Sequence, residues 1–255
     1  RISFCLAPHA PYTVADKTFE KIATLAAQLE VPIHMHVHET AHEIEESLKL
    51  HGVRPIERLR RLGLLSPQLI AVHAVHLEPA EIDLLAHHGC HVAHCPTSNM
   101  KLASGIPPMA AVHARGVSFG LGTDGAASNN RLDMFHEIRH AALLAKAASL
   151  DAEALGAHAV LAAATLGGAR ALGLESQIGS LLAGKQADFC AVKLDEWLLQ
   201  PCYDPASHLV YTAGREQVTH VWVGGKLVMS HGNPSQIDDS ELLDIAGLWH
   251  TRLTS

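Results

Sequence analysis

Three histidines on alternate residues, followed at once by a glutamate, carry the most informative chemistry in this sequence. His34, His36 and His38 precede Glu39 in a run whose other members are apolar. A β-strand turns successive side chains to opposite faces, so the three imidazoles are predicted to share one face of a strand. Imidazoles beside a carboxylate are suited to holding a metal ion and to moving a proton next to it.

Two metal-binding interpretations compete for this run. The residues from His38 to His42 match HExxH, the zinc-protease motif, in which both histidines face the metal from one helix. That interpretation requires His38 and Glu39 to lie inside a helix, whereas the alternating pattern predicts a strand, with a helix beginning near Ala41. The second interpretation takes His36 as a metal ligand and Glu39 as a proton carrier just past the strand's end. We favour the second.

Other predicted strand ends carry residues that could complete such a site. Asp124 follows an apolar strand and lies among glycines, where one carboxylate oxygen could bind a metal and the other accept a proton, or where it could simply cap a turn or helix. His73 ends another buried strand and is either catalytic or structural. His9 lies between prolines on a rigid loop, which suits a substrate contact. Residues 94–99 are expected to line the mouth of the same site.

Short apolar strands alternate with longer helical patterns through the first two thirds of the chain, which predicts a parallel α/β sheet with right-handed crossovers. The expected strands are Ile2–Ala7, Val31–His38, Leu69–Ala74, His91–His94 and Val117–Gly122. The expected helices are Asp16–Leu29, Ala41–His51, Pro55–Leu62, Pro79–His88, Pro108–Arg115, Arg131–Ala148 and Ala152–Leu172.

The placement of the polar residues favours a (β/α)8 TIM-type barrel over a doubly wound sheet. They fall at the carboxyl ends of the strands, where barrel active sites are assembled. No expected strand is followed by a GxGxxG or GxxxxGK[ST] phosphate loop, which argues against the main nucleotide-binding folds. Because only five strands are visible, we expect about three N-terminal strands of the barrel to be absent from this chain.

The pattern of the sequence changes after the last of these helices, from alternating strands and helices to short strands separated by glycines. Glycines punctuate the chain, and a Gly224-Gly225 pair is suited to a tight hairpin turn. We therefore expect residues 1–184 to form a partial barrel, 185–235 a small β domain that is part of a β-sandwich, and 236–255 a C-terminal helix docked on the body. The expected strands and helix of this part are Ala187–Lys193, His220–Val223, Lys226–Met229 and Ser240–Arg252.

The composition argues against some classes of partner and location for this protein. The net charge of −7 argues against nucleic acid as a partner, and no apolar run reaches the length of about 20 residues that a membrane span needs. The five cysteines are scattered without a CxxC pair, which favours free thiols in the cytoplasm. The chain opens directly on an apolar pattern without an initiator Met, so we expect it to be the later part of a longer protein.

Together these motifs resemble the amidohydrolase superfamily, specifically its cytosine/guanine deaminase and triazine hydrolase branch. The resemblance runs over essentially the whole chain and is carried, in order, by residues 7–12, 36–40, 72–77, 94–102 and 121–130. It implies a hydrolytic deaminase of a purine nucleoside such as 5-methylthioadenosine or S-adenosylhomocysteine, which releases ammonia. Guanine, cytosine or a chlorinated triazine is the alternative substrate, and a non-catalytic metal-binding protein on the same fold is the alternative of another class.

The resemblance also assigns roles to residues. It implies one divalent metal per subunit, zinc or alternatively Fe²⁺, with His36 and Asp124 as ligands. Glu39 becomes the acid/base and a substrate contact, His73 and Asp124 become catalytic, and His9 contacts the small-molecule substrate. Two further ligands, a His-x-His pair on the first barrel strand, are expected upstream of this sequence, because residues 34–36 occupy a later strand. Relatives of this kind commonly form homodimers or higher homo-oligomers.

Overall fold

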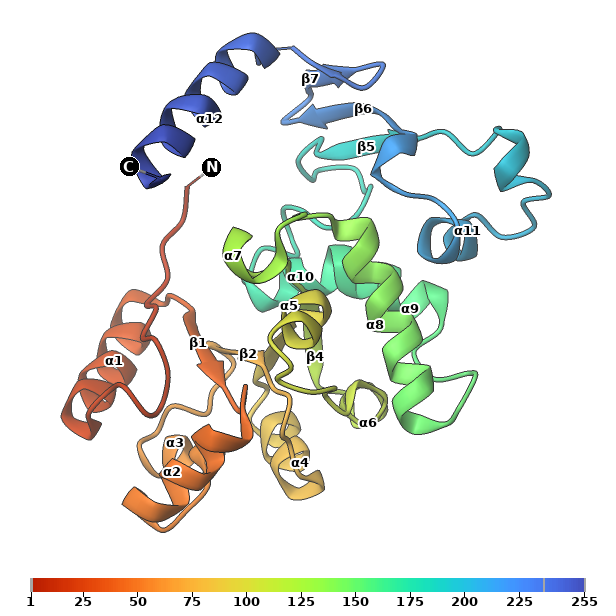
Figure 1. Ribbon diagram of the computed structural model, residues 1–255. Helices are drawn as coiled ribbons and strands as arrows, with labels where there is room; N and C mark the ends of the chain where they lie inside the picture. Colours follow the sequence, from red (N-terminus) through yellow and green to blue (C-terminus); the bar gives the residue numbers. More distant parts are fainter. Residues whose placement is uncertain (1, 236, 255) are drawn as a thin grey trace.

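The computed structural model describes residues 2–235 and 237–254, which form a parallel sheet covered by helices and a separate antiparallel sheet (Figure 1). The predicted α/β class is confirmed. The parallel sheet has the order β1-β2-β3-β4 and is open at both edges, so the described residues form no closed barrel. Its strands are β1 (Ile33–Val37), β2 (Leu69–His73), β3 (His91–His94) and β4 (Ser118–Leu121).

The first predicted strand, Ile2–Ala7, is wrong. Only Leu6 pairs with β1, through a single parallel bridge to Ile33. The apolar side chains before it find nothing to pack against, since Ile2 is 88% and Phe4 is 80% exposed. Alternation of apolar residues predicts a strand only where a neighbouring layer covers one of its faces.

The helices begin and end where the sequence carries capping residues. Thr40 caps α2 by accepting a hydrogen bond from the Glu43 amide, and Gly52 ends that helix in the left-handed conformation. Proline in the first turn starts α3 and α4. The helices of this part are α1 (Asp16–Leu29), α2 (Ala41–His51), α3 (Pro55–Arg61), α4 (Pro79–His87), α5 (Pro96–Lys101), α6 (Met109–Ala114), α7 (Ala126–Asn129) and α8 (Met134–Ser149).

The core lies between the parallel sheet and these helices. Alternate residues of β1 are buried, and every residue of β2 is buried. Each buried aliphatic side chain contributes about 1.5–3 kcal/mol relative to leaving it in water. This packing fixes the strand ends that carry the candidate site. The largest fully buried side chains include Phe19, Ile33, Met35, Ile56, Leu59, Leu64, Leu69, Ile70, Ile82, Leu85 and Met109.

Strand β4 is held by close backbone contact with the segment that follows α8. The single helix predicted over residues 152–172 is instead a turn followed by α9 (Ala157–Ala162), the π-helical turn η1 (Ala163–Gly167) and α10 (Gly168–Ala171). A Cβ atom at Gly167 would lie 2.3 Å from the Phe119 carbonyl oxygen. Only glycine lets the two backbones approach so closely.

The later part of the chain forms an antiparallel sheet of order β5-β6-β7-β8. Gly224 and Gly225 have φ of 58° and 75° and make the predicted tight turn between β6 and β7. No second sheet packs on this one among the described residues, so the expected sandwich is not formed. The elements are β5 (Phe189–Val192), η2 (Trp197–Leu199), α11 (Pro205–Tyr211), η3 (Arg215–Gln217), β6 (Val218–Val223), β7 (Lys226–Ser230) and β8 (Asn233–Pro234).

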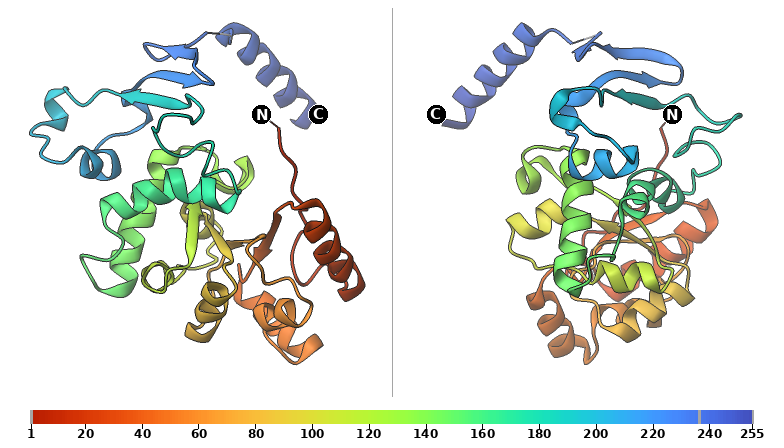
Figure 2. Two further views of the ribbon diagram at one scale, coloured as in Figure 1. Left: turned by 180° about the vertical axis from the view of Figure 1, so that it is seen from behind. Right: turned by 90° about the vertical axis from the view of Figure 1, so that its right-hand side faces the viewer.

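The last helix, α12 (Asp239–Thr254), projects away from the rest of the molecule (Figures 1 and 2). None of its residues is buried, and the expected docking on the body is not formed in this structure. Its apolar residues are spaced for packing, but the neighbouring surface of the described chain does not reach them. No helix in residues 2–235 and 237–254 combines the length and apolar character required to cross a bilayer.

Candidate active site

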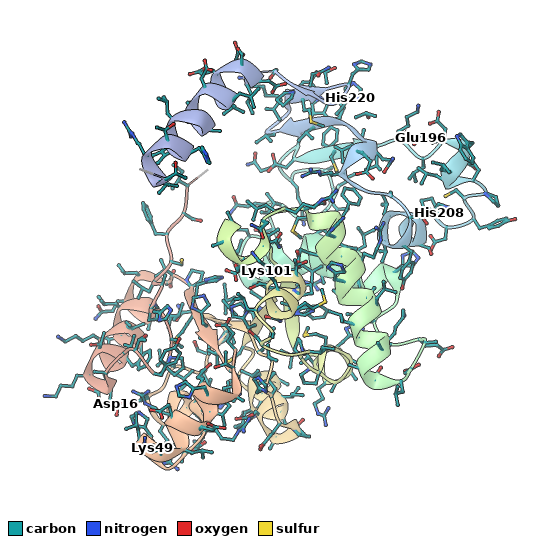
Figure 3. All side chains as sticks on the ribbon, viewed as in Figure 1. Asp16, Lys49, Lys101, Glu196, His208 and His220 are labelled. Carbon is teal, nitrogen blue, oxygen red and sulfur yellow. The ribbon has the colours of Figure 1, made fainter. Side chains whose placement is uncertain are left out.

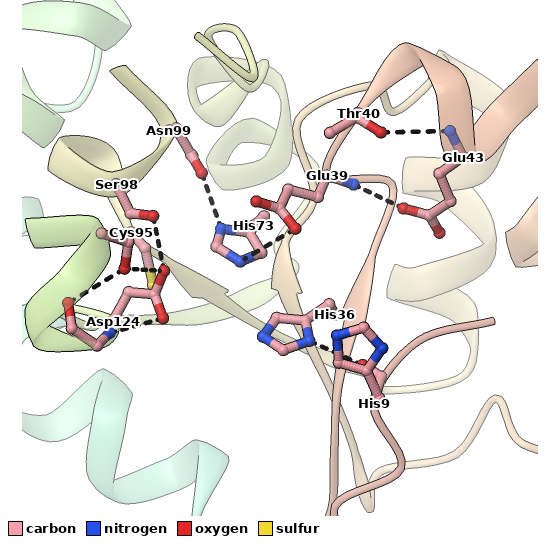
Figure 4. A network of polar contacts seen from close by, with 12 residues as sticks. His9, His36, Glu39, Thr40, Glu43, His73, Cys95, Ser98, Asn99 and Asp124 are labelled. Carbon is pink, nitrogen blue, oxygen red and sulfur yellow. Dashed lines mark hydrogen bonds and ion pairs between the residues drawn. The ribbon is translucent and has the colours of Figure 1, made fainter. Parts of the chain in front are cut away.

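The candidate site lies where the chain leaves the parallel strands. The residues at three strand ends, His38, His73 and Asp124, have positive φ angles of 57°, 71° and 60°. A residue other than glycine in this left-handed region costs about 1–3 kcal/mol, so the surrounding structure must hold it there. These turns redirect the side chains that follow each strand toward the same edge of the sheet (Figure 4).

His36 is oriented by the loop that carries His9. Its Nδ1–H donates to the His9 carbonyl oxygen over 2.8 Å, which leaves the Nε2 lone pair free to bind a metal. The His9 ring is exposed, lies 5.2 Å from the His36 ring, and is itself fixed by Thr13 Oγ1 at 3.0 Å from Nδ1. The loop thus supplies a carbonyl that sets the tautomer of His36 and a ring available to a substrate.

His73 lies between an amide and a carboxylate. The residue is 1% exposed, and its Nδ1 is 2.8 Å from Asn99 Oδ1. Its Nε2 lies 3.8 Å from Glu39 Oε2, and its ring stacks on the His36 ring with centroids 5.3 Å apart. Because an amide oxygen can only accept, Nδ1 carries a proton and Nε2 faces Glu39.

A second glutamate fixes the backbone of Glu39. Glu43 Oε2 accepts the Glu39 backbone N–H over 2.9 Å. The Glu43 side chain is buried, and that burial raises its pKa to about 7 although backbone hydrogen bonds from His38 and Glu39 act in the opposite direction. Together with the Thr40 cap, this bond ties the start of α2 to the end of β1 and positions the Glu39 carboxylate beside His73 (Figure 4).

Asp124 is the most fully hydrogen-bonded carboxylate of the site. Oδ2 accepts from Ser98 Oγ over 2.6 Å and from Ser128 Oγ over 2.7 Å, and Oδ1 accepts the Gly125 amide over 2.7 Å. Burial raises the pKa of Asp124, but these three bonds and the charge of His73 together lower it below its usual value. The group is therefore held ionised, which suits it to bind a cation or to accept a proton.

His38 does not share the face of His36, which corrects one prediction. Its left-handed backbone ends the strand and turns its side chain into the core, where Nε2 accepts the Ile56 amide over 3.3 Å. Burial lowers its pKa to about 3, so it stays neutral. Since α2 begins at Ala41 and His42 is exposed, the HExxH helix is not formed. The protease interpretation is wrong.

The donors present fit a metal in their chemistry. His36 offers a free Nε2, Asp124 offers a carboxylate, and Figure 4 shows both beside His73. Within residues 2–235 and 237–254, however, no group of three or more His, Cys, Asp or Glu side chains is gathered that could hold a metal. His34, expected to pack inside a barrel, is exposed because its face of β1 is uncovered. The ligand roles of these residues remain predictions.

Sequence reasoning missed several residues that organise the site. The Ser98 and Asn99 segment was expected to line the mouth, but their bonds to Asp124 and His73 were not foreseen. Glu43 was missed too, although a glutamate beside buried Ile44 on the core face of an amphipathic helix is a signal of a buried polar role.

The chain is similar in sequence to known deaminases. A 5-methylthioadenosine/S-adenosylhomocysteine deaminase from Teredinibacter turnerae is 48% identical over 246 residues, and one from Saccharophagus degradans is 41% identical over 252. These matches cover 96% and 99% of this chain. The chain spans only 56% of the length of each of these curated relatives.

Solved structures agree with these sequence relatives. An adenosine deaminase from Xanthomonas campestris with bound zinc has a TM-score of 0.96 and 50% identity, over 98% of this chain and 57% of its own. An atrazine chlorohydrolase from Arthrobacter aurescens complexed with zinc has a TM-score of 0.89 and 28% identity, over 95% of this chain and 54% of its own. A model of the amidohydrolase family matches residues 1–228. The predicted resemblance is confirmed: the chain belongs to the amidohydrolase family.

Proposed function

We propose that this chain provides the catalytic residues of a metal-dependent hydrolytic deaminase acting on a purine nucleoside such as 5-methylthioadenosine or S-adenosylhomocysteine. The observation that carries the proposal is the arrangement of Glu39, His73 and Asn99, a carboxylate and an amide on either side of one buried imidazole. Relatives of 41% and 48% identity named for this activity support the choice of substrate.

Each residue then has a defined task. Glu39 takes a proton from water and delivers it to the purine ring nitrogen beside the attacked carbon, which makes that carbon electrophilic. His73 orients the water and stabilises charge on the substrate through Nε2, while Asp124 accepts the second proton of the water. The water oxygen adds to the carbon that bears the amino group. The proton taken by Asp124 passes to the amino group, which leaves as ammonia, and the ring nitrogen keeps the proton delivered by Glu39. His9 contacts the substrate.

His36 and Asp124 would hold the metal, for which zinc is the first choice and Fe²⁺ the second. Such a cation supplies Lewis acidity that lowers the pKa of water to about 7. Catalytic zinc sites use three protein ligands, so the proposal requires further ligands beyond those that the described residues gather. The zinc in the two solved neighbours supports this assignment.

The architecture proposed with this function is the predicted one. Residues 1–184 would be part of a (β/α)8 barrel and 185–235 part of a β-sandwich, with 236–255 as a helix that docks on the body of the complete protein. The open edges of the parallel sheet support a larger closed sheet. Five free cysteines support a cytoplasmic location, and a homo-oligomer is proposed on the family resemblance.

Substitution of Glu39 tests the function. Glu39→Gln removes the proton carrier but keeps the shape of the side chain, so ammonia release from methylthioadenosine is expected to fall by about 10² to 10⁴ fold. Zinc content is expected to stay at the wild-type level. Glu45→Gln, at an exposed position of α2, the helix that follows Glu39, is the matched control and should be fully active.

The same assay should include S-adenosylhomocysteine, adenosine, guanine, cytosine and a chlorinated triazine. Turnover of guanine, cytosine or a triazine in preference to the nucleosides would replace the proposed substrate while keeping the site. Loss of zinc from Glu39→Gln would show that Glu39 is a ligand and not the proton carrier. Stoichiometric zinc without hydrolysis of any of these compounds by the wild-type protein would favour a non-catalytic metal-binding protein.

A further inference from the structure

A buried carboxylate outside the proposed chemistry joins two segments of the site. Glu137 of α8 is 0% exposed. Its Oε2 accepts the backbone N–H of Thr97 over 3.0 Å, and its Oε1 accepts Asn129 Nδ2 over 2.7 Å. No ion pair found within the described ranges includes it. A carboxylate removed from water without a cation is costly unless hydrogen bonds compensate for the lost hydration, so these two bonds must have strict geometry.

Both partners of Glu137 stand next to a residue that holds Asp124. Thr97 precedes Ser98, and Asn129 follows Ser128, and these two serines donate to Asp124 Oδ2 over 2.6 and 2.7 Å. Glu137 therefore binds the Thr97 backbone in α5 on one side and the Asn129 side chain at the end of α7 on the other. The two hydroxyl groups meet at one oxygen only if α5 and α7 keep their spacing.

Asn129 extends the same connection to the end of strand β4. Its Nδ2 also donates to the Thr123 carbonyl oxygen over 2.8 Å, immediately before Asp124. On the exposed side lies Lys101 of α5, which is labelled in Figure 3. Its ammonium group donates to the Ala127 carbonyl oxygen and to Asn130 Oδ1. The two helices are thus tied at the surface by a lysine and in the interior by Glu137, and only the interior tie excludes water.

This geometry determines which part of Asp124 is left to act. With two hydroxyl donors, Oδ2 has both of its lone pairs occupied, whereas among the described residues Oδ1 accepts only the Gly125 amide and keeps one lone pair. The φ of 60° at Asp124 adds strain that the surroundings must balance. A shift of either helix would release a serine, and the carboxylate could then rotate.

We propose that Glu137 is a positioning residue for Asp124: by fixing Thr97 and Asn129 it sets both serines, and through them the single free lone pair of the carboxylate. The inference rests on the proposed function for the role given to Asp124, but the geometric claim can be tested without any turnover.

Glu137→Gln is the sharpest variant. Glutamine has one acceptor oxygen and one NH₂ group, so it can accept from Thr97 or from Asn129 but presents a donor to the other. Glu137→Asp keeps two acceptors on a shorter side chain and should give an intermediate effect, and it carries the comparison if the glutamine variant does not fold. Glu153→Gln, at an exposed position, controls for loss of one negative charge. Leu85→Ala, on the core face of α4, controls for loss of stability.

Hydrogen exchange of the Gly125 amide reports the orientation of Asp124 directly, because that amide donates to Oδ1. Exchange should accelerate about 10-fold or more in Glu137→Gln, less in Glu137→Asp, and not in Glu153→Gln. In Leu85→Ala, Gly125 should exchange no faster than the loss of global stability dictates. Unchanged Gly125 exchange in both Glu137 variants would overturn the proposal, whatever the protein catalyses.

Zinc affinity and catalysis provide the second measurement. In the complete protein, zinc affinity or kcat for the nucleoside should fall by about 10 to 100 fold in Glu137→Gln, the usual effect of removing a group that orients a ligand. The acid limb of the kcat–pH profile should move as well, while KM changes little. An equal loss in Leu85→Ala, or a pH profile that does not move, would make the role merely structural. If the wild-type protein deaminates nothing, the proposed function fails and the Gly125 result still decides the role of Glu137.

Discussion

The parallel sheet and the antiparallel sheet of this chain differ in how completely their apolar residues are buried. The buried cluster is built almost wholly from residues before 172, and Val210 of α11 is the only later residue among its described, fully buried members. By contrast, the antiparallel sheet is at most partly buried, and α12 leaves Leu243 73% and Leu253 81% exposed.

This difference explains where strained chemistry can be placed. The left-handed residues His38, His73 and Asp124 all lie at or just past the ends of strands of the parallel sheet, whose packing and hydrogen bonds hold the local backbone in place. The antiparallel sheet has no comparable core, and its half-buried His220 packs only against the rings of Trp222 and His231, with centroids 5.6 and 4.7 Å away, and against the Thr219 hydroxyl, with no carboxylate beside it among the described residues. A rich supply of imidazoles is therefore not sufficient for a site, which also needs a core to hold it.

Replacing one leucine by alanine in each region should give the largest difference in unfolding free energy. Leu85→Ala removes a side chain of α4 that is 0% exposed and should cost about 2–5 kcal/mol of unfolding free energy. Leu243→Ala, the same change on α12, should stay within about 0.5 kcal/mol. Urea unfolding monitored by circular dichroism measures both. A comparable loss in Leu243→Ala would show that α12 packs in solution and would break the comparison.

A buried histidine in the parallel sheet should also make the unfolding free energy fall in acid. Burial, with a smaller effect from the charge of His73, lowers the pKa of His94 from 6.5 to about 3. A depressed folded-state pKa means that stability is complete above about pH 6.5 and is lost as the pH falls toward 3. The expected loss is about 2 kcal/mol at pH 5.

Comparison with His94→Leu isolates this contribution, because other groups titrate in the same range. Burial raises the pKa of Glu43 from 4.5 to about 7, so its contribution is complete below about pH 4.5 and is lost as the pH rises through 7. Between pH 7 and pH 5, wild-type unfolding free energy should fall by about 2 kcal/mol more than that of His94→Leu. Parallel pH profiles for the two proteins would contradict the prediction.

Helix capping provides the smallest test. Thr40→Ala removes the side-chain acceptor at the start of α2 and should cost about 1 kcal/mol. Thr251→Ala, on exposed α12, removes only a bond to the Gly247 carbonyl one turn earlier and should be neutral. Thermal unfolding of both variants measures the difference. An equal effect at the two positions would mean that the cap at Thr40 is unimportant.

Much of the part that contains the parallel sheet was predictable, because there the apolar periodicity and the residues that begin and end helices and strands indicate the same boundaries. His91–His94 was predicted to the residue, and β1 and β4 were found within two residues at each end. The positions of Glu39, His73 and Asp124 at or just past strand ends follow from the same pattern. Their roles, by contrast, come from the family resemblance and not from the pattern.

What failed had a physical cause in each case. Ile2–Ala7 has the composition of a strand but only one bridge to pair with, and composition cannot reveal whether a partner is present. His38 was placed beside His36 because alternation assumes that the strand continues, whereas a left-handed residue ends it. The roles of Glu43 and Glu137 depend on hydrogen bonds between segments, and no local pattern contains that information.

The contact between Gly167 and the Phe119 carbonyl has a consequence for how this chain tolerates change. Even the methyl group of alanine at position 167 would sit 2.3 Å from that oxygen and displace β4, the strand that leads directly to Asp124. In a saturation library selected for activity, this remote position should therefore be depleted of all replacements as severely as the catalytic positions themselves. Such a map would mark as essential a residue that has no reactive group at all.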